Sequence, residues 1–215
     1  MKINCDNISK LDSYKLLTSS VVPRPIAWVT TLDADGNLNL APFSVFAHVS
    51  KTPPKVMFAI TKQKPGFGTE FKDTEVNILA RKEFVINIPS VEHAEQVDVS
   101  ADFFPPGVDE AKLLGLASVP SDRISVPRLE NVGVSMECVL SDIADFSGDD
   151  RMMLLIGEVK MFHIRDDLYN DGKIDSVALN PLMRLGGPNY GAISQNIHIK
   201  ERPVVSHRPY TGRYS

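Results

Sequence analysis

Residues able to bind a ligand are concentrated between Pro23 and Phe46. The first part of this run, 26–32, is rich in β-branched and aromatic residues, which favour a β-strand. The second part carries Asn39, Pro42 and Ser44 among apolar residues. Proline cannot donate a hydrogen bond to a neighbouring strand and is therefore expected at an edge or a bulge. A bulged strand with small polar side chains leaves backbone N–H groups free, so the run predicts a binding groove on a β-barrel.

A second group of candidate ligand-binding residues lies between positions 62 and 77. Lys62 stands in a segment that leads from a strand to a helix, and Thr74 and Asn77 lie three positions apart on one face of that helix. A cation and a hydroxyl at such a junction are groups that bind a phosphate. Arg24 lies between two prolines, which stiffen it. The alternatives are a solvated charge for Lys62, helix capping for Thr74 and a surface ion pair for Arg24.

Motifs for other chemistries are missing or incomplete. The five histidines have no metal-ligand spacing, so the sequence predicts no metal site. The segment 66–68 begins like a dinucleotide fingerprint, but Phe71 replaces its third glycine. Asp33, Asp35 and Asn37 imitate the start of a calcium loop, but no downstream glutamate completes it. These three residues are therefore interpreted as a hairpin turn.

The composition is ordinary for a soluble globular protein. The chain has 215 residues, of which 43% are hydrophobic and 23% charged, and its net charge is −4. This balance argues against a broad nucleic-acid surface, and no apolar run approaches the ~20 residues that a membrane span needs. The N-terminal residues 1–6 lack the apolar stretch of a signal peptide, so a cytoplasmic protein is expected. Cys5 and Cys138 form no disulfide framework, and Cys138 is expected to pack as a small hydrophobic residue.

The elements expected to position the candidate residues are mostly strands. Helices are expected at 12–19 (capped by Asp12 or Ser13), 69–82, 91–101 and 108–115, and strands at 26–32, 38–48, 55–60, 84–88, 132–146 and 151–164. Such an order, with inserted helices but no βαβ alternation, predicts a closed antiparallel barrel with helical additions. The hairpin 132–164, with its polar turn at 147–150, is apolar on too many consecutive positions for a one-faced strand. We therefore expect a homodimer that buries its second face.

Several motifs, taken in order, resemble one known family. They are RPIAWVTT, NLAPFSVF, KTPPKVMFAI, KDTEVNI, PRLENVGVSMEC, GEVKMFHIRDDLY and RLGGPNY. Together they resemble the flavin reductase-like proteins of the FMN-binding split-barrel fold, over residues 10 to 190. The resemblance implies a mainly β fold with helical additions, in one domain of residues 1–190. Residues 191–215 have little periodicity and are expected to form an extended C-terminal arm.

The resemblance implies an NAD(P)H:flavin oxidoreductase. FMN, or FAD, would receive a hydride from NADH or NADPH, and the reduced flavin or its electrons would pass to a partner such as a monooxygenase. Two alternatives stay open: an electron-transfer flavoprotein without free-flavin reductase activity, and a non-enzymatic flavin-binding module. The sequence does not separate them.

The residues and the resemblance together give a candidate site. In the family, the strands at 26–46 line the isoalloxazine, the KDTEVNI segment holds the phosphate or ribityl chain, and the RLGGPNY segment closes the site. The flavin-binding candidates are Arg24, Thr30, Thr31, Asn39, Ala41, Pro42, Phe43, Ser44, Phe46, Lys62, Thr74, Asn77, Arg184 and Tyr190. The resemblance also implies that His163 lies beside the open face of the flavin and acts in hydride transfer or nicotinamide docking. Its alternative is a strand-end histidine with a hydrogen-bond partner.

Overall fold

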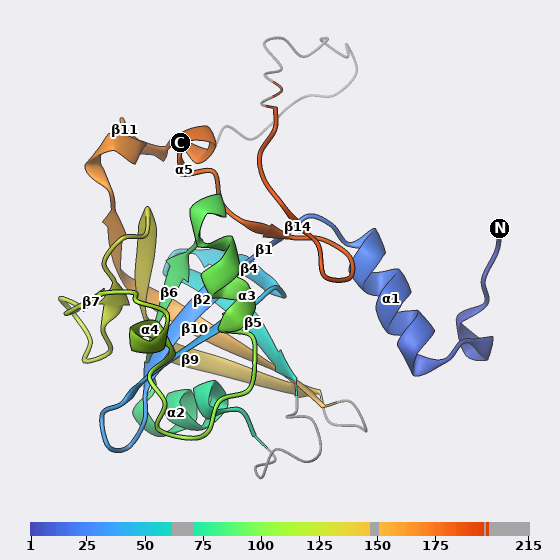
Figure 1. Ribbon diagram of the computed structural model, residues 1–215, viewed down its shortest axis with the longest axis horizontal. Helices are drawn as coiled ribbons and strands as arrows, with labels where there is room; N and C mark the ends of the chain where they lie inside the picture. Colours follow the sequence, from blue (N-terminus) through green and yellow to red (C-terminus); the bar gives the residue numbers. More distant parts are fainter. Residues whose placement is uncertain (62–70, 147–150, 196, 198–215) are drawn as a thin grey trace.

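A seven-stranded antiparallel sheet forms the centre of the computed structural model, which describes residues 1–61, 71–146, 151–195 and 197 (Figure 1). The strands of this sheet are β2 (Ala27–Leu32), β3 (Leu38–Phe43), β4 (Phe46–Lys51), β5 (Pro54–Thr61), β6 (Glu83–Ile88), β9 (Val134–Phe146) and β10 (Met152–Ile164). Their order is β3-β2-β6-β9-β10-β5-β4. The two edge strands, β3 and β4, are therefore consecutive in the chain.

The passage from β3 to β4 closes the sheet into a barrel. Two residues, Ser44 and Val45, separate the edge strands, and the backbone N–H of Ala59 on β5 donates to the carbonyl of Val45 at 2.9 Å. The strand expected at 38–48 is thus divided in two. Pro42 lies near the end of β3, where it needs no donor toward a further strand. The expected barrel with helical additions is confirmed.

Helices and short strands surround the barrel. The helices are α1 (Lys10–Ser20), α2 (Asp73–Arg81), α3 (Ala94–Val99), α4 (Glu110–Leu113) and α5 (Ser176–Leu179), with 3-10 turns at Cys5–Asn7, Val91–His93 and Asp166–Leu168. The short strands are β1 (Arg24–Pro25), β7 (Ser118–Val119), β8 (Arg128–Leu129), β11 (Tyr169–Asn170), β12 (Lys173–Ile174), β13 (Met183–Arg184) and β14 (Tyr190–Gly191). Among the described residues, no helix is both long and apolar enough to cross a membrane.

Strand alternation divides the core into two clusters. Ala27 and Val29 of β2 point into the barrel, where Phe58 and Phe84 also pack. Trp28, between them, points to the outer face of the sheet and packs in a second cluster with Leu40, Val97 and Leu129. Its indole N–H donates to the Ser100 hydroxyl at 2.9 Å. Trp28 is therefore a core residue.

Two helix boundaries differ from expectation. The N-cap of α1 is Ser9, whose hydroxyl accepts from the Asp12 N–H, and not Asp12 or Ser13. Helix α2 begins at Asp73 rather than 69, and residues 69 and 70 lie outside the described part. Its N-cap, Lys72, makes no side-chain cap bond, because an ammonium group cannot accept from a backbone N–H. The Thr74 hydroxyl donates to the side-chain oxygen of Asn39 on β3.

Helix α1 stands away from the barrel (Figure 1). It contains no buried residue, and Leu11, Tyr14 and Leu17 are each at least 60% exposed. These three side chains lie three positions apart and follow one face of the helix. The chain before α1 carries Cys5, which is exposed, whereas Cys138 is buried in the barrel as expected. The expected arm at 191–215 lies mostly outside the described residues.

Candidate functional site

The connection between β3 and β4 consists of Ser44 and Val45 and is called the β3–β4 crossing below. It offers hydrogen-bonding groups that a ligand can use. In the described part of the chain, the backbone N–H groups of Ser44 and Val45 donate to no protein acceptor, and the Ser44 hydroxyl makes no hydrogen bond. Ser44 is half-buried and Val45 is exposed. Two adjacent backbone donors and one hydroxyl at an accessible turn can bind carbonyl oxygens and ring nitrogens of a ligand. These donors lie in the connection between β3 and β4 and not on the bulged strand that was expected, because β3 pairs with β2 in an unbroken register.

An apolar groove of about 600 Å³ begins beside this crossing. Its lining is mostly apolar and comes from β1, β4, β5, β9 and β10: Pro25, Phe46, Ala47, Pro54, Val56, Met136, Val159 and Phe162. His48, Ser50, Lys51 and Lys55 add polar atoms, and Lys55 forms an ion pair of 2.8 Å with Asp142. Phe46 therefore joins the free donors to an apolar surface, and a flat ring with polar edges needs both.

Four of the candidate residues form a buried hydrogen-bond network behind the crossing. The side-chain oxygen of Asn39 accepts from the hydroxyls of Thr31 at 3.2 Å and Thr74 at 2.9 Å. The Asn77 amide donates to the Thr31 hydroxyl at 3.0 Å. Glu110 of α4 completes the network, because its carboxylate accepts from the Asn39 amide at 2.9 Å and from the Leu40 N–H at 2.8 Å.

This network joins elements far apart in the sequence and leaves little open surface. The five residues whose side chains form the network are each at least nine-tenths buried. Burial raises the pKa of Glu110, and the bonds from Leu40 and Asn39 only partly offset this. A cavity of about 50 Å³ lies beside Asn39 and Asn77, next to Asp73, whose pKa is raised by burial and then by the charge of Asp33. Sequence reasoning missed Glu110, because nothing in the segment 108–115 marks its carboxylate as buried.

The candidate phosphate-binding residues are only partly described. Lys62 lies outside the described residues. Thr74 is buried and bonded to Asn39, as noted above. Lys72, which was not among the candidates, places its ammonium group 5.7 Å from the centre of the Phe43 ring. Lys72 lies immediately before α2, in the KDTEVNI segment, and this position in the sequence could have indicated a cation beside β3.

Arg24, Arg184 and Tyr190 lie together in a small sheet of β1, β13 and β14, where Arg24 pairs with Arg184 across the strands. The Arg24 guanidinium donates to the carbonyls of Thr18, Val21 and Leu185 at 2.5, 2.9 and 3.1 Å, and thereby caps the end of α1. The Arg184 guanidinium lies 4.4 Å from the Tyr190 ring centre. The structure therefore gives each of these side chains a partner within the segment formed by α1, β13 and β14 or the residues next to them.

Thr30 and Thr31 face opposite sides of β2, as strand geometry requires. The Thr30 hydroxyl donates to the carbonyl of Pro127 at 2.8 Å on the outer face. Thr30 is fully buried, so it supports the loop before β8. Of the candidates on β3, Ala41 and Pro42 are half-buried and Phe43 is buried against Phe58, with ring centres 4.9 Å apart.

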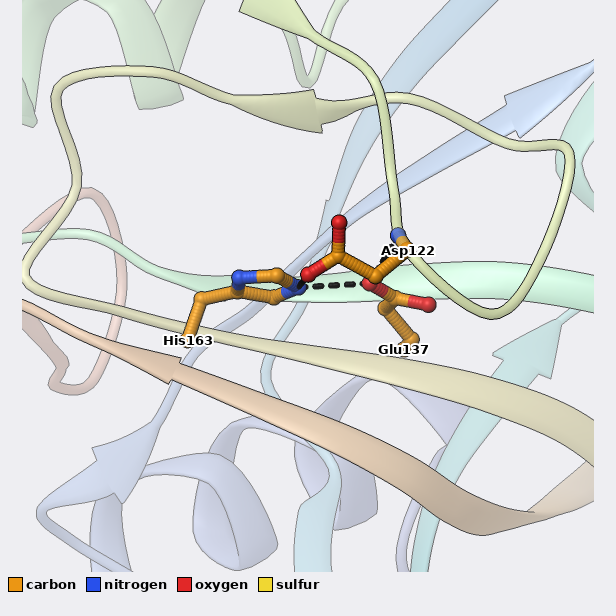
Figure 2. Close-up of side chains that lie close together, drawn as sticks. All are labelled: Asp122, Glu137 and His163. Carbon is orange, nitrogen blue, oxygen red and sulfur yellow. Dashed lines mark hydrogen bonds and ion pairs between the residues drawn. The ribbon is translucent and has the colours of Figure 1, made fainter.

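His163 lies on the opposite face of β10 from the groove. Phe162 lines the groove, and the next residue of a strand points the other way. The His163 Nε2 lies 2.5 Å from Oε1 of Glu137, whose side chain is fully buried (Figure 2). Burial would raise the pKa of Glu137, but the Asp122 N–H, the His163 bond and the Arg123 N–H together lower it. The structure thus does not bring His163 to the β3–β4 crossing.

Comparison with known proteins places this chain in a family. A family model described as the flavin reductase like domain matches residues 18–182. The chain belongs to this family. Its split-barrel fold is shared with a putative flavin reductase with split barrel domain from Shewanella frigidimarina, which has 18% identity, a TM-score of 0.80, and coverage of 94% of this chain and 100% of the other.

Two solved structures are more similar in sequence to this flavin reductase-like protein. Nitrilotriacetate monooxygenase component B from Bacillus cereus is 35% identical, with a TM-score of 0.86 and coverage of 93% of this chain and 98% of the other. The 2-nitrobenzoate 2-nitroreductase NbaA from Pseudomonas fluorescens is 30% identical, with a TM-score of 0.84 and coverage of 99% and 100%. The family membership and the fold inferred from the sequence motifs are therefore confirmed.

Proposed function

We propose that this flavin reductase-like protein binds FMN at the β3–β4 crossing and reduces it with NADH or NADPH. The observation that carries the proposal is the pair of backbone N–H groups at Ser44 and Val45, which find no acceptor among the described residues and lie beside Phe46. The isoalloxazine ring is flat and apolar on its faces, and its edge carries hydrogen-bond acceptors. The crossing supplies donors and the groove supplies an apolar surface, so each part of the ring meets a matching part of the site.

The residues of this chain bind and orient, and bound FMN supplies the hydride chemistry. Ser44 and the two N–H groups hold the ring edge, and Phe46 excludes water from one face. The buried network of Thr31, Asn39 and Glu110 fixes the backbone of β3, on which the crossing depends. A rigid backbone keeps the donors in position for the ring. Lys62 and Lys72 are the proposed cations for the flavin phosphate; FAD, which shares the ring, is the alternative flavin.

Flavin titration tests this proposal directly. Binding of FMN to the flavin-free protein should quench the fluorescence of the flavin, with one site per chain. The substitution Phe46→Ala should weaken FMN binding about tenfold or more, since each buried aromatic side chain contributes about 1.5–3 kcal/mol. Tyr169→Ala, which removes an exposed aromatic side chain on β11, is the matched control and should bind as the wild type does. If FMN does not bind up to millimolar concentration, the proposal fails.

Passage of the reduced flavin, or of its electrons, to a partner monooxygenase is the proposed physiological step. Support comes from the similarity to component B of a nitrilotriacetate monooxygenase over nearly the whole of both chains. NADH or NADPH oxidation that stays fast with excess free FMN would support a released flavin. Oxidation limited to one turnover per chain would instead indicate an electron-transfer flavoprotein, and no oxidation with FMN, FAD or riboflavin would indicate a flavin-binding module.

Direct reduction of a nitroaromatic compound is a second candidate function. It is favoured by the 30% identity to a 2-nitrobenzoate 2-nitroreductase along the full length of both chains. The apolar groove, with Lys51 and Lys55 among its lining residues, could take an aromatic ring that bears an anionic group. Steady-state NADPH oxidation with and without 2-nitrobenzoate, at saturating FMN, separates the two functions. If 2-nitrobenzoate stimulates NADPH oxidation in an oxygen-free nitrogen atmosphere, nitroaromatic reduction is the favoured function.

A further inference from the structure

A cluster of potential metal ligands lies outside the proposed flavin site. Asp122, Glu137 and His163 each offer one ligand atom, and these atoms all lie within 4.8 Å of one another (Figure 2). They come from the loop after β7, from β9 and from β10. His163 pairs with Ser135 across the hairpin and lies diagonal to Glu137 on the same face. No sequence motif marks this cluster, because 14 or more residues lie between its members along the chain.

We propose that Asp122, Glu137 and His163 bind one divalent transition-metal ion of the zinc type. An imidazole nitrogen with two carboxylate oxygens is a ligand set that Zn²⁺ accepts in proteins. Two ionised carboxylates also balance the charge of a divalent cation when the imidazole is neutral. Three protein ligands leave a fourth position for water or for an added anion.

The Glu137 carboxylate is held in place before any ion arrives. Its side chain is fully buried, and its two oxygens accept from the backbone N–H groups of Asp122 and Arg123, each at 2.7 Å. Each carboxylate oxygen has two lone pairs, so one N–H bond on each leaves capacity for a metal. A ligand fixed by neighbouring hydrogen bonds does not have to be ordered when the ion binds.

Asp122 supplies the open side of the site. Its side chain is 68% exposed, whereas that of His163 is 18% exposed, so an ion would enter from the solvent beside Asp122. The Asp122 Oδ2 lies 4.0 Å from the His163 Nε2. Two ligands on one tetrahedral Zn²⁺ lie roughly 3.4 Å apart at bond lengths of about 2.1 Å. Binding would therefore draw Asp122 inward and increase the distance between the His163 Nε2 and the Glu137 Oε1 by a little under 1 Å.

Isothermal titration of zinc chloride into the full chain, after treatment with a chelator, tests the proposal. Cys5→Ser serves as the background, because the exposed Cys5 thiol is itself a possible zinc ligand. We expect one ion per chain with a dissociation constant on the order of 10 µM, which is weaker binding than that of structural zinc centres with four protein ligands. Cobalt(II) in place of zinc should show the visible absorption of a tetrahedral site.

Two substitutions locate the ion. Asp122→Asn removes one charged ligand at an exposed position and should weaken zinc binding tenfold or more, and His163→Gln should weaken it at least as much. Asp102→Asn, at another exposed aspartate, is the matched control and should leave binding unchanged. If zinc does not bind below 1 mM, or if neither substitution weakens it, the proposal is overturned. The cluster would then be a hydrogen-bonded contact between the loop and the hairpin.

Discussion

Asn39 is the residue on which the proposed ring-binding segment depends most. Its amide joins β3 to β2, α2 and α4 through Thr31, Thr74 and Glu110, and Leu40 beside it donates to the same carboxylate. Each member of such a network satisfies the buried polar groups of another, so removal of one leaves several without a partner. The network is therefore a support for β3, and in the proposed site its side chains act on the flavin only indirectly.

We predict that Asn39→Ala lowers the free energy of unfolding by about 2–4 kcal/mol, since the Glu110 carboxylate and the hydroxyls of Thr31 and Thr74 would be left buried without their partner. Urea denaturation followed by circular dichroism measures this loss. Asn170→Ala, at an exposed position on β11, is the control and should change the unfolding free energy by less than about 0.5 kcal/mol. Equal effects of the two substitutions would contradict the role given to the network.

A second prediction at this scale concerns the pH dependence of stability. Because burial raises the pKa of Glu110 above its ordinary value of 4.5, the folded state binds its proton more tightly than the unfolded state does. The contribution of Glu110 to stability therefore falls as pH rises from about 4.5 through the raised pKa. Asp73, which lies nearby, acts in the same direction.

Glu110→Gln removes this titration while it keeps an oxygen to accept from Leu40. The variant should gain stability relative to the wild type as the pH rises from 4.5 to 7, in urea denaturation at both values. Glu95→Gln, at an exposed position of α3, should show no such trend. A difference between Glu110→Gln and the wild type that is the same at both pH values would rule out a raised pKa.

At the scale of elements, strands were predicted better than their connections. Residues 132–146 and 151–164 were expected as a hairpin and form β9 and β10, because alternating and β-branched residues determine strands locally. The division of 38–48 at Ser44 could not be predicted, because it depends on how the sheet closes into a barrel, where the Val45 carbonyl accepts from the Ala59 N–H on β5. The same holds for His163: its partner Glu137 is 26 residues away, on a face that the strand pattern alone does not assign.

Gly157 shows how closely β10 is packed against the barrel interior. It lies at a change of register between β10 and β9, and a Cβ added there would lie too close to the Phe84 ring and 3.0 Å from the Cys138 Cβ. We predict that Gly157→Ala costs about 1–3 kcal/mol of unfolding free energy by overpacking. Phe84→Leu in the same chain should restore part of the loss, because the smaller side chain gives room. Additive effects in the double mutant would show that the two residues do not interact.

At the scale of the whole molecule, two apolar surfaces have no partner within the described chain. One is the face of α1 with Leu11, Tyr14 and Leu17, and the other is the outer face of the β9–β10 hairpin, which carries Ala144, Leu154 and Ile156. The hairpin was expected to be apolar on both faces, and its inner residues do alternate with half-buried Leu154 and Ile156. We propose that a second copy of the chain covers the outer face.

Sedimentation should therefore give about twice the chain mass of 23.7 kDa. Leu154→Asp would place a charge in the apolar contact and should shift the protein to the mass of one chain, since burying an unpaired carboxylate is costly. Val177→Asp, at an exposed position of α5, is the control and should leave the mass unchanged. A wild type that sediments as a monomer at high concentration would remove the proposed contact.

The opposite surroundings of the two cysteines have a practical consequence. Burial raises the pKa of the Cys138 thiol, and its side chain is closed to solvent, so alkylating reagents should not reach it in the folded protein. Cys5, just before α1, is exposed and should react at once. A dye attached through a maleimide would thus mark a single position without any engineering of the sequence. Because that position is next to the helix that stands away from the barrel, energy transfer between labelled copies would report where α1 lies in the assembled protein.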